Sequence, residues 1–408
     1  MSKNLTVKEL VKSIAETVAD IQEEPEFQRG DRRRHFASSN DGTPQVKLAM
    51  GNVPVDYDLW EDLRNPALVG LYPAGLPEIW EFHANRRKQK TDESGRQSIF
   101  QIPRSFDYAL NNYTRAVLIS VMLPFSAEVV RDYVGQVIEN KKASSHLFAK
   151  MYEDTNRIVD RAVNRVAIQL ASSDPEDVVV AMTNDNVKAV STETIAQTRQ
   201  GISHGPSKGG NYPQKSLAVL LGLGQFGVSR IVFRDEMIDG KVQRFAGPIR
   251  SIVVFDKQPL AKDEADGVMY PSKEWRQFLL RLFDFTDAGS EINRYRFCAY
   301  MPEDDSGCSR CVENCPSGAQ PNSVSLPSGA YAEAVARQAH RFWKGKLQFD
   351  FNKCTDERGQ LSGLYPEWSC ARCLTTCLDR GQRRKRAAID FYSRMRELAG
   401  AEAMSPAT

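Results

Sequence analysis

The sequence lacks any apolar run as long as the roughly 20 residues that a membrane-spanning helix requires. It also lacks an excess of charge of one sign, because 54 lysines and arginines face 52 aspartates and glutamates, a net charge of +2. The first absence excludes a membrane protein. The second removes the long-range field that draws a protein to nucleic acid or to an anionic membrane. With 41% hydrophobic residues among 408, we expect a globular chain of two or three domains.

Cysteine is absent from the first 297 residues, and all eight cysteines lie between Cys298 and Cys377. A disulfide framework would be distributed over the fold that it crosslinks, and a chain of this length can bury a sufficient core without one. The N-terminal stretch MSKNLTVKELV also has no apolar segment of the kind found in secretory signals. We therefore expect a reducing, cytoplasmic compartment and a chemical role for the cysteines.

The spacing of apolar residues predicts the regular elements. Helices are expected over residues 10–21, 151–170, 274–285 and 332–343, and buried strands over 116–123, 177–182 and 249–256. Residues 23–105 are polar and interrupted by proline and glycine, so we expect them to wrap a core formed elsewhere. The pattern indicates a mixed α/β or α+β domain followed by a small cysteine-rich module from about residue 290.

Two glycine-rich segments are candidates for ligand contact. Residues 201–213, GISHGPSKGGNYP, form a long loop, and loops of this length inside a compact domain usually have a function. The alternative is a surface insertion without a function. Gly222, Gly224 and Gly227 match the dinucleotide fingerprint G-x-G-x-x-G. A β-like stretch follows them instead of a helix, and position 247 is glycine where an acidic residue is required, so we reject a nicotinamide site.

The cysteines form two similar triplets, Cys308-x2-Cys311-x3-Cys315-Pro316 and Cys370-x2-Cys373-x3-Cys377. This spacing is typical of ferredoxins, in which three cysteines of one run hold one cubane cluster and the fourth holds the other. The remaining ferredoxin cysteine would fall at position 305, which is aspartate, so Cys298 is the nearest candidate.

All eight cysteines then fit two [4Fe–4S] clusters. The first set is Cys298, Cys308, Cys311 and Cys377, and the second is Cys315, Cys354, Cys370 and Cys373. The alternative is a structural zinc ion on the two C-x2-C pairs. Zinc leaves Cys315 and Cys377 unexplained, although both follow their triplets at the same offset.

Several segments occur in an order that resembles a known family. They are SLAVLLGLGQFGVSR (216–230), GPIRSIVVFDKQPL (247–260), CSRCVENCPSGA (308–319), LQFDFNKC (347–354) and CARCLTTC (370–377). This order resembles the reductive dehalogenases, which use cobalamin and iron–sulfur clusters to reduce organohalides. It is also similar to their relatives, the epoxyqueuosine reductases, which share the cofactors and the core fold.

The resemblance implies a domain order and a cofactor site. It implies an N-terminal wrapping region over 1–105, a nitroreductase-like cobalamin-binding domain over 106–290, a ferredoxin-like module over 291–380, and a C-terminal helix and tail over 381–408. The corrinoid is expected partly under the 201–213 loop. Its expected contacts are Gly209, Gly210, Asn211, Gly222, Gly224 and Gln225.

Two catalytic residues are implied by the same resemblance. Tyr152 matches the family's proposed proton donor, and Arg250 matches its active-site arginine. An isolated tyrosine has a pKa of about 10, so a nearby cation such as Arg250 is expected to make it a better acid. The alternatives are a packed aromatic ring for Tyr152 and a surface residue for Arg250. Epoxyqueuosine reductases carry an aspartate directly before this tyrosine, whereas here Met151 stands there, which favours dehalogenation.

The resulting expectation is a cobalamin-dependent reductive dehalogenase. Its partners would be a small organohalide and an external electron donor, such as a ferredoxin, a flavodoxin or a separate reductase, with no membrane and no nucleic acid. The alternatives are a tRNA-acting reductase, supported only by the basic run at 380–386, an electron-transfer protein that uses the clusters alone, and a family member that reduces a non-halogenated substrate.

Overall fold

The computed structural model describes the front of the chain and selected parts of its cysteine-rich end. The described residues are 6–27, 35–57, 76–77, 79–80, 88–91, 97–100, 105–139, 146–173, 177–183, 214–227, 231–257, 268–269, 272–282, 291–298, 311, 374, 377 and 385–399. Three cysteines are therefore described, namely Cys298, Cys311 and Cys377. The other five, the 201–213 loop with Gly209, Gly210 and Asn211, and the helix expected over 332–343 lie outside the described residues.

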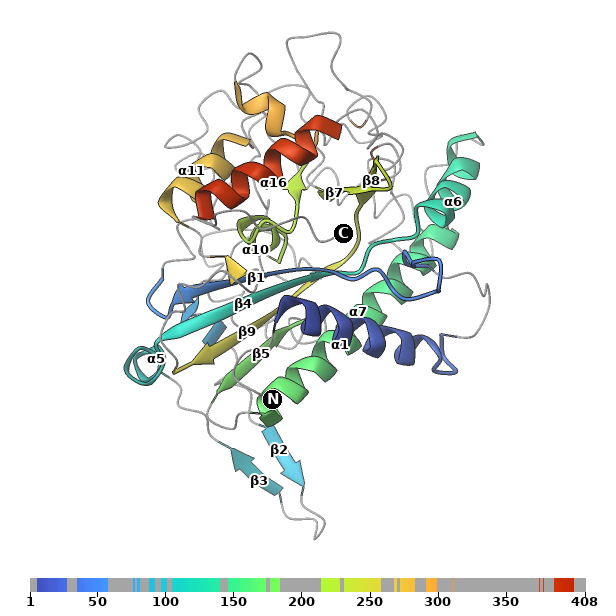
Figure 1. The fold of residues 1–408 in the computed structure, drawn as a ribbon. Coiled ribbons are helices and arrows are strands. Elements are labelled where there is room, and N and C mark those ends of the chain that lie inside the picture. Colours follow the sequence, from blue (N-terminus) through green and yellow to red (C-terminus); the bar gives the residue numbers. More distant parts are fainter. Residues whose placement is uncertain are drawn as a thin grey trace, which may run out of the picture.

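A five-stranded sheet forms the centre of the fold (Figure 1), in the order β10-β1-β4-β9-β5. Its strands are β1 (Lys47–Pro54), β4 (Arg115–Met122), β5 (Val178–Met182), β9 (Ile249–Asp256) and β10 (Val268–Met269). All described pairs are antiparallel except β1 with β10. The central strands β4 and β9 read as nearly continuous apolar runs because both of their faces are buried.

Two helices, α1 (Val7–Gln22) and α7 (His146–Ser173), cover one face of the sheet. Thr6 begins α1 with a capping box, since its hydroxyl accepts from the amide of Glu9 at 3.2 Å and its own amide donates to the Glu9 carboxylate at 3.0 Å. The apolar faces of both helices pack on Met50, Val121 and Ile252 of the sheet. Side chains at even positions of β9 therefore face α7.

The opposite face of the sheet carries α10 (Gln214–Leu220), α11 (Lys273–Leu282), the 3-10 helix η2 (Glu291–Tyr295) and α16 (Lys385–Ala399). Their core includes Trp275 and Phe391, which pack against one another with ring centroids 6.1 Å apart. This helical layer contains η2, which ends three residues before Cys298. Ile292, Tyr295 and Phe297 are buried in its core, so the start of the cysteine-rich module belongs to the same core as the sheet.

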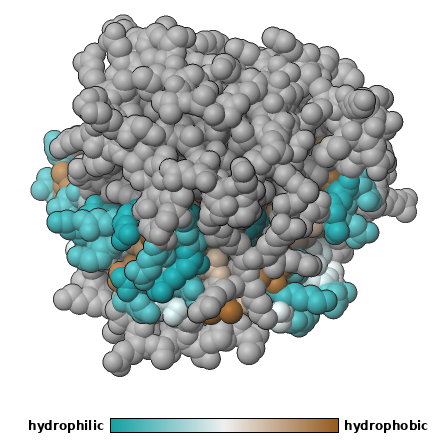
Figure 2. Space-filling view, turned by 90° about the horizontal axis from the view of Figure 1, so that it is seen from above, coloured by the Kyte–Doolittle hydropathy of each residue, from teal (hydrophilic) through white to brown (hydrophobic). Residues whose placement is uncertain are grey.

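The other elements are smaller. A second sheet contains β6 (Gln225–Phe226), β7 (Val232–Ile238) and β8 (Lys241–Phe245), and a third contains β2 (Lys88–Thr91) and β3 (Gln97–Phe100). The remaining described helices are α5 (Phe106–Asn112) and α6 (Ala127–Glu139). Seen from above, the described surface is mostly hydrophilic with small apolar areas between (Figure 2).

Most predicted elements of the described region are confirmed. The strands expected over 116–123, 177–182 and 249–256 are β4, β5 and β9, and three expected helices are α1, α7 and α11. The mixed α/β, α+β class is also confirmed. One expectation differs from the structure: residues 23–105 do not only wrap the core, because β1 pairs with β4 along its whole length inside the sheet.

Candidate functional site

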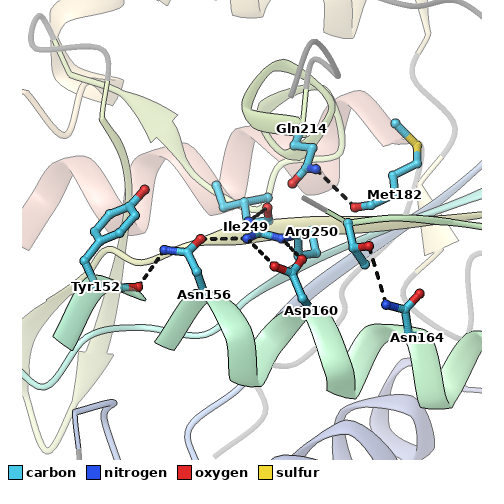
Figure 3. A network of polar contacts seen from close by, with 9 residues as sticks. Tyr152, Asn156, Asp160, Asn164, Met182, Gln214, Ile249 and Arg250 are labelled. Atoms are coloured by element: carbon cyan, nitrogen blue, oxygen red, sulfur yellow. Dashed lines mark hydrogen bonds and ion pairs between the residues drawn. The ribbon is translucent and has the colours of Figure 1, made fainter. Parts of the chain in front are cut away.

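Arg250 lies at the centre of a buried polar network between β9 and α7 (Figure 3). Its guanidinium forms an ion pair with both carboxylate oxygens of Asp160, in one case at 3.1 Å. It also donates to the side-chain oxygen of Asn156 at 2.6 Å and to the carbonyl of Ile249 at 2.8 Å. Arg250 and Asp160 are each only 4% exposed. A charge buried this deeply requires an opposite charge and nearly complete hydrogen bonding, and the network supplies both.

The network reaches Tyr152 through the helix backbone. The Asn156 side chain donates to the backbone carbonyl of Tyr152 at 2.7 Å. Tyr152, Asn156 and Asp160 follow one another at steps of four residues, which places them along one face of α7. Tyr152 lies in the second turn of this helix rather than at its start.

The phenol ring of Tyr152 packs against aromatic residues. Its centroid is 5.5 Å from that of Phe125 and 6.2 Å from that of Phe148. The structure thus brings Tyr152 and Arg250, 98 residues apart, into one network, but it modifies their expected relationship. The charge of Arg250 is compensated by Asp160, and the contact with Tyr152 runs through Asn156 to the main chain, so Arg250 fixes the position of this part of α7.

The two glycines of the GLGQ segment, Gly222 and Gly224, are each required by the local structure. Gly222 ends α10 with φ +72°, and the amides of Gly222 and Leu223 donate to the carbonyls of Val219 and Ala218, which is a Schellman cap. A Cβ at Gly224 would lie 2.4 Å from the carbonyl oxygen of Phe233. The segment therefore links a helix to strands β6 and β7, the reverse of the strand-to-helix order of a dinucleotide site.

Gln225 connects this segment to the residues before Cys298. Its side chain is buried, and its amide nitrogen donates to the carbonyl of Tyr295 at 2.8 Å. Its amide oxygen accepts from the backbone N–H of Phe297 at 3.0 Å. Both ends of the amide are thus engaged by the chain that leads into the cysteine module.

Arg244 and Asp235 form a second buried ion pair, which the sequence analysis missed. They lie opposite one another in the β7–β8 hairpin, whose turn, Asp239–Gly240, has positive φ at both residues. The guanidinium donates to the two Asp235 oxygens at 2.7 and 2.6 Å. Burial alone would lower the pKa of Arg244, but the Asp235 carboxylate outweighs this effect and raises the pKa, so Arg244 carries its charge.

The same guanidinium contacts the cysteine module at two places. It donates to the carbonyl of Phe297 at 2.6 Å and to the carbonyl of Cys377 at 3.4 Å. Phe297 directly precedes Cys298. One arginine therefore joins the backbone beside two cysteines that are 79 positions apart and that the spacing assigns to the same cluster.

Cys377 and Tyr152 both pack against one apolar cluster. Its buried members are Phe125, Val129, Val130, Tyr133, Phe148, Met151, Phe233, Ala246 and Leu374. This cluster lies beyond the ends of β4 and β9, where α6, α7 and β7 meet. The candidate proton donor and a candidate cluster ligand therefore share one packing unit.

The three described cysteines provide a partial test for iron–sulfur clusters. Cys298, Cys311 and Cys377 are thiols, and Cys311 is buried. No group of three metal-ligating side chains is found among the described residues. These three cysteines all belong to the first set, whose fourth member, Cys308, lies outside the described residues, as does the whole second set. The fit therefore depends on donor chemistry. Arg244 contacts the backbone at Cys377 and directly before Cys298, and thiolates of these two residues close to a buried cation would suit an anionic cluster.

The sheet face opposite Arg250 holds two buried hydroxyls that suit a polar ligand. Ser120 and Ser251 are direct partners on β4 and β9, and both are fully buried. Neither hydroxyl has a hydrogen-bond partner among the described residues. Met182 is the β5 partner of Ser251, and its backbone carbonyl accepts a hydrogen bond from the side chain of Gln214 at 3.1 Å. The residues that flank segment 184–213 are therefore in contact beside Ser251. Such orphaned hydroxyls fit a group that brings its own hydrogen-bonding amides, as a corrinoid does.

We found no match to the chain among family models, curated proteins or solved structures. Of the helices that the structure describes, none combines the length and apolar composition needed to cross a membrane. The functional assignment therefore depends on the residues and their arrangement.

Proposed function

We propose that this protein is a reductive dehalogenase with a nitroreductase-like front domain and a ferredoxin-like cysteine module. The overall reaction is R–X + 2e⁻ + H⁺ → R–H + X⁻, in which the carbon–halogen bond breaks, a carbon–hydrogen bond forms and halide leaves. The cysteine pattern and the order of the shared segments support this assignment.

The observation that carries the proposal is the shared packing of Tyr152 and Cys377. An electron relay ending at a cysteine-held cluster must reach the same place at which a proton is delivered. Tyr152 and Cys377 pack against one apolar cluster, and Arg244 links the backbone of Cys377 to that of Cys298. The arrangement is therefore suited to delivering electrons and a proton to one substrate.

The chain's own residues have three tasks in this reaction. Tyr152 donates the proton to carbon from its phenol oxygen, and its ring is held against Phe125 and Phe148. Asn156 and Asp160, held by Arg250, fix the turn of α7 that carries Tyr152. Arg250 is thus a positioning residue.

The cofactors are a corrinoid and two [4Fe–4S] clusters. When bound, the corrinoid supplies a strongly reducing cobalt centre and the clusters supply electrons one at a time. Cys298, Cys308, Cys311 and Cys377 would hold one cluster, and Cys315, Cys354, Cys370 and Cys373 the other. For the corrinoid we propose Gly209, Gly210 and Asn211 of segment 184–213, together with the hydroxyls of Ser120 and Ser251. Gly222, Gly224 and Gln225, the other expected contacts, have structural roles in the α10–β6 connection.

The partners follow from the chemistry. The substrate is a small organohalide, and an external donor in the cytoplasm, such as a ferredoxin, a flavodoxin or a separate reductase, supplies the electrons. A tRNA-acting reductase is not favoured, because Met151 is fully buried and carries no exchangeable proton.

The test is turnover by anaerobically purified protein with both cofactors bound. With a low-potential chemical reductant and a haloaromatic or haloalkene panel, we expect release of halide and formation of the dehalogenated product. Tyr152→Phe keeps the ring and removes the proton, so we expect turnover to fall by about 10² or more while both cofactors remain bound. The matched control is Tyr133→Phe, at a buried tyrosine of the same cluster, which should retain turnover. Loaded protein that reduces no organohalide would overturn the proposal.

A further inference from the structure

The buried Arg244–Asp235 pair has more contacts than an ion pair requires for its own stability. Asp235 is completely buried, and Arg244 is 8% exposed. Two guanidinium nitrogens are satisfied by Asp235. The ring of Phe233 lies against the guanidinium, with its centroid 5.0 Å from the central carbon. These contacts hold the guanidinium in one orientation.

That orientation directs the remaining N–H groups toward the cysteine module. One nitrogen donates to the Phe297 carbonyl and another to the Cys377 carbonyl. A guanidinium is planar and presents its donors in a rigid fork, so it fixes the spacing of two acceptors in a way that lysine does not. On the far side of Phe297, Gln225 holds the neighbouring backbone groups. The backbone that leads to Cys298 is therefore anchored on both sides.

We infer that Arg244 is a positioning residue that holds Cys298 and Cys377 on one iron–sulfur cluster, and that the Arg244–Asp235 pair sets the reduction potential of that cluster. The inference rests on the proposed function, because it requires the clusters. A reduced cluster carries one more negative charge than an oxidised one. A fixed cation beside its ligands favours reduction and raises the potential, and the Asp235 carboxylate partly offsets this effect.

The opposite signs of the two charges provide the test. In protein with its clusters bound, each cluster is titrated by electron paramagnetic resonance in the wild type, Arg244→Gln and Asp235→Asn. We expect Arg244→Gln to lower the potential of one cluster, with about a tenfold fall in its reduced-to-oxidised ratio at a fixed potential, or about 59 mV for one electron. Asp235→Asn should raise the potential of the same cluster. The second cluster should be unchanged.

A matched control separates this role from general stability. Arg115 and Asp256 form another ion pair, mostly buried and at 2.5 Å, between the ends of β4 and β9. Arg115→Gln should destabilise the fold and leave both potentials unchanged. If Arg244→Gln or Asp235→Asn fails to fold, the double variant Asp235→Asn/Arg244→Gln, which removes both buried charges, is titrated instead. It should still shift one cluster only, because the carbonyls of Phe297 and Cys377 lose their donor.

The outcomes distinguish the inference from the proposed function. Two clusters in the wild type with unshifted potentials in all Arg244 and Asp235 variants would overturn the inference and leave the proposed function intact. Equal shifts in Arg115→Gln and Arg244→Gln would also overturn it. Wild-type protein without iron would overturn both.

Discussion

Replacing Asp160 by asparagine removes the charge that balances Arg250 at the centre of the α7–β9 network. The variant leaves a guanidinium with 4% exposure beside a neutral amide. Breaking a buried pair by removing one partner costs about 3–5 kcal/mol. Because an asparagine oxygen can still accept one hydrogen bond, we expect a loss near the lower end, about 3 kcal/mol. That is about two powers of ten in the unfolding equilibrium constant.

Two further variants calibrate this value. Asn156→Ala removes one hydrogen bond to Arg250 and one to the Tyr152 carbonyl but leaves the ion pair, so we expect a loss of about 1–2 kcal/mol. Glu24→Gln weakens ion pairs of Arg161 and Arg165, which are partly solvent-accessible, so its effect should stay below about 1 kcal/mol.

The assay is equilibrium urea unfolding followed by tryptophan fluorescence. Trp80 and Trp275 are fully buried in the core on the other sheet face, so their emission reports loss of the whole layered structure. The expected order of destabilisation is Asp160→Asn, then Asn156→Ala, then Glu24→Gln. A loss below about 1 kcal/mol for Asp160→Asn, or a larger loss for Asn156→Ala, would refute the reasoning that the buried ion pair dominates this network.

Three other outcomes follow from the described contacts. Gly224→Ala should cost about 3 kcal/mol of stability, because its Cβ would meet the Phe233 carbonyl at 2.4 Å. Gly240→Ala, in open space with φ +71°, should cost about 1 kcal/mol. Equal losses for the two variants by urea unfolding would contradict this. Gln225→Ala should raise hydrogen exchange at the amide of Phe297, measured by mass spectrometry, and unchanged exchange would argue against the tether. Burial alone would raise the pKa of Glu236, but Arg234 and Lys47 outweigh burial and lower this pKa below 4.5. The ionised Glu236 therefore stabilises the folded state fully above pH 4.5, and this stabilisation is lost as the pH falls through the lower pKa of the folded state. Glu236→Gln should therefore flatten the acid limb of stability against pH, and an unaltered limb would exclude this contribution.

Helices and strands were predicted correctly where burial of one or both faces imposes a regular pattern of apolar residues on the sequence. Strands β4 and β9 are buried on both faces, so their apolar runs are unmistakable, and α7 shows its apolar face at helical spacing. Strand β1 was missed because KLAMGNVP contains glycine, asparagine and proline, which disfavour strands. Pairing with β4 and burial override that local preference.

The site was only partly accessible to sequence reasoning. Tyr152 and Arg250 came from family resemblance, but the pairing of Arg250 with Asp160 depends on the packing of α7 on β9. The four-residue steps from Tyr152 to Asn156 and Asp160 were a usable signal, since they define one helix face. Asp235 and Arg244 were also within reach, because Asp-Gly at 239–240 is a typical two-residue hairpin turn that sets them opposite one another. Their contacts to Phe297 and Cys377 depend on tertiary structure.

The most direct test of the central claim is the metal content of anaerobically purified protein, measured per chain by mass spectrometry together with the ultraviolet–visible spectrum. Eight cysteines in two four-thiolate sets predict about eight iron atoms, about one cobalt atom with a corrinoid spectrum, and little zinc. A chain with about one zinc atom, no iron and no corrinoid absorption would contradict the assignment.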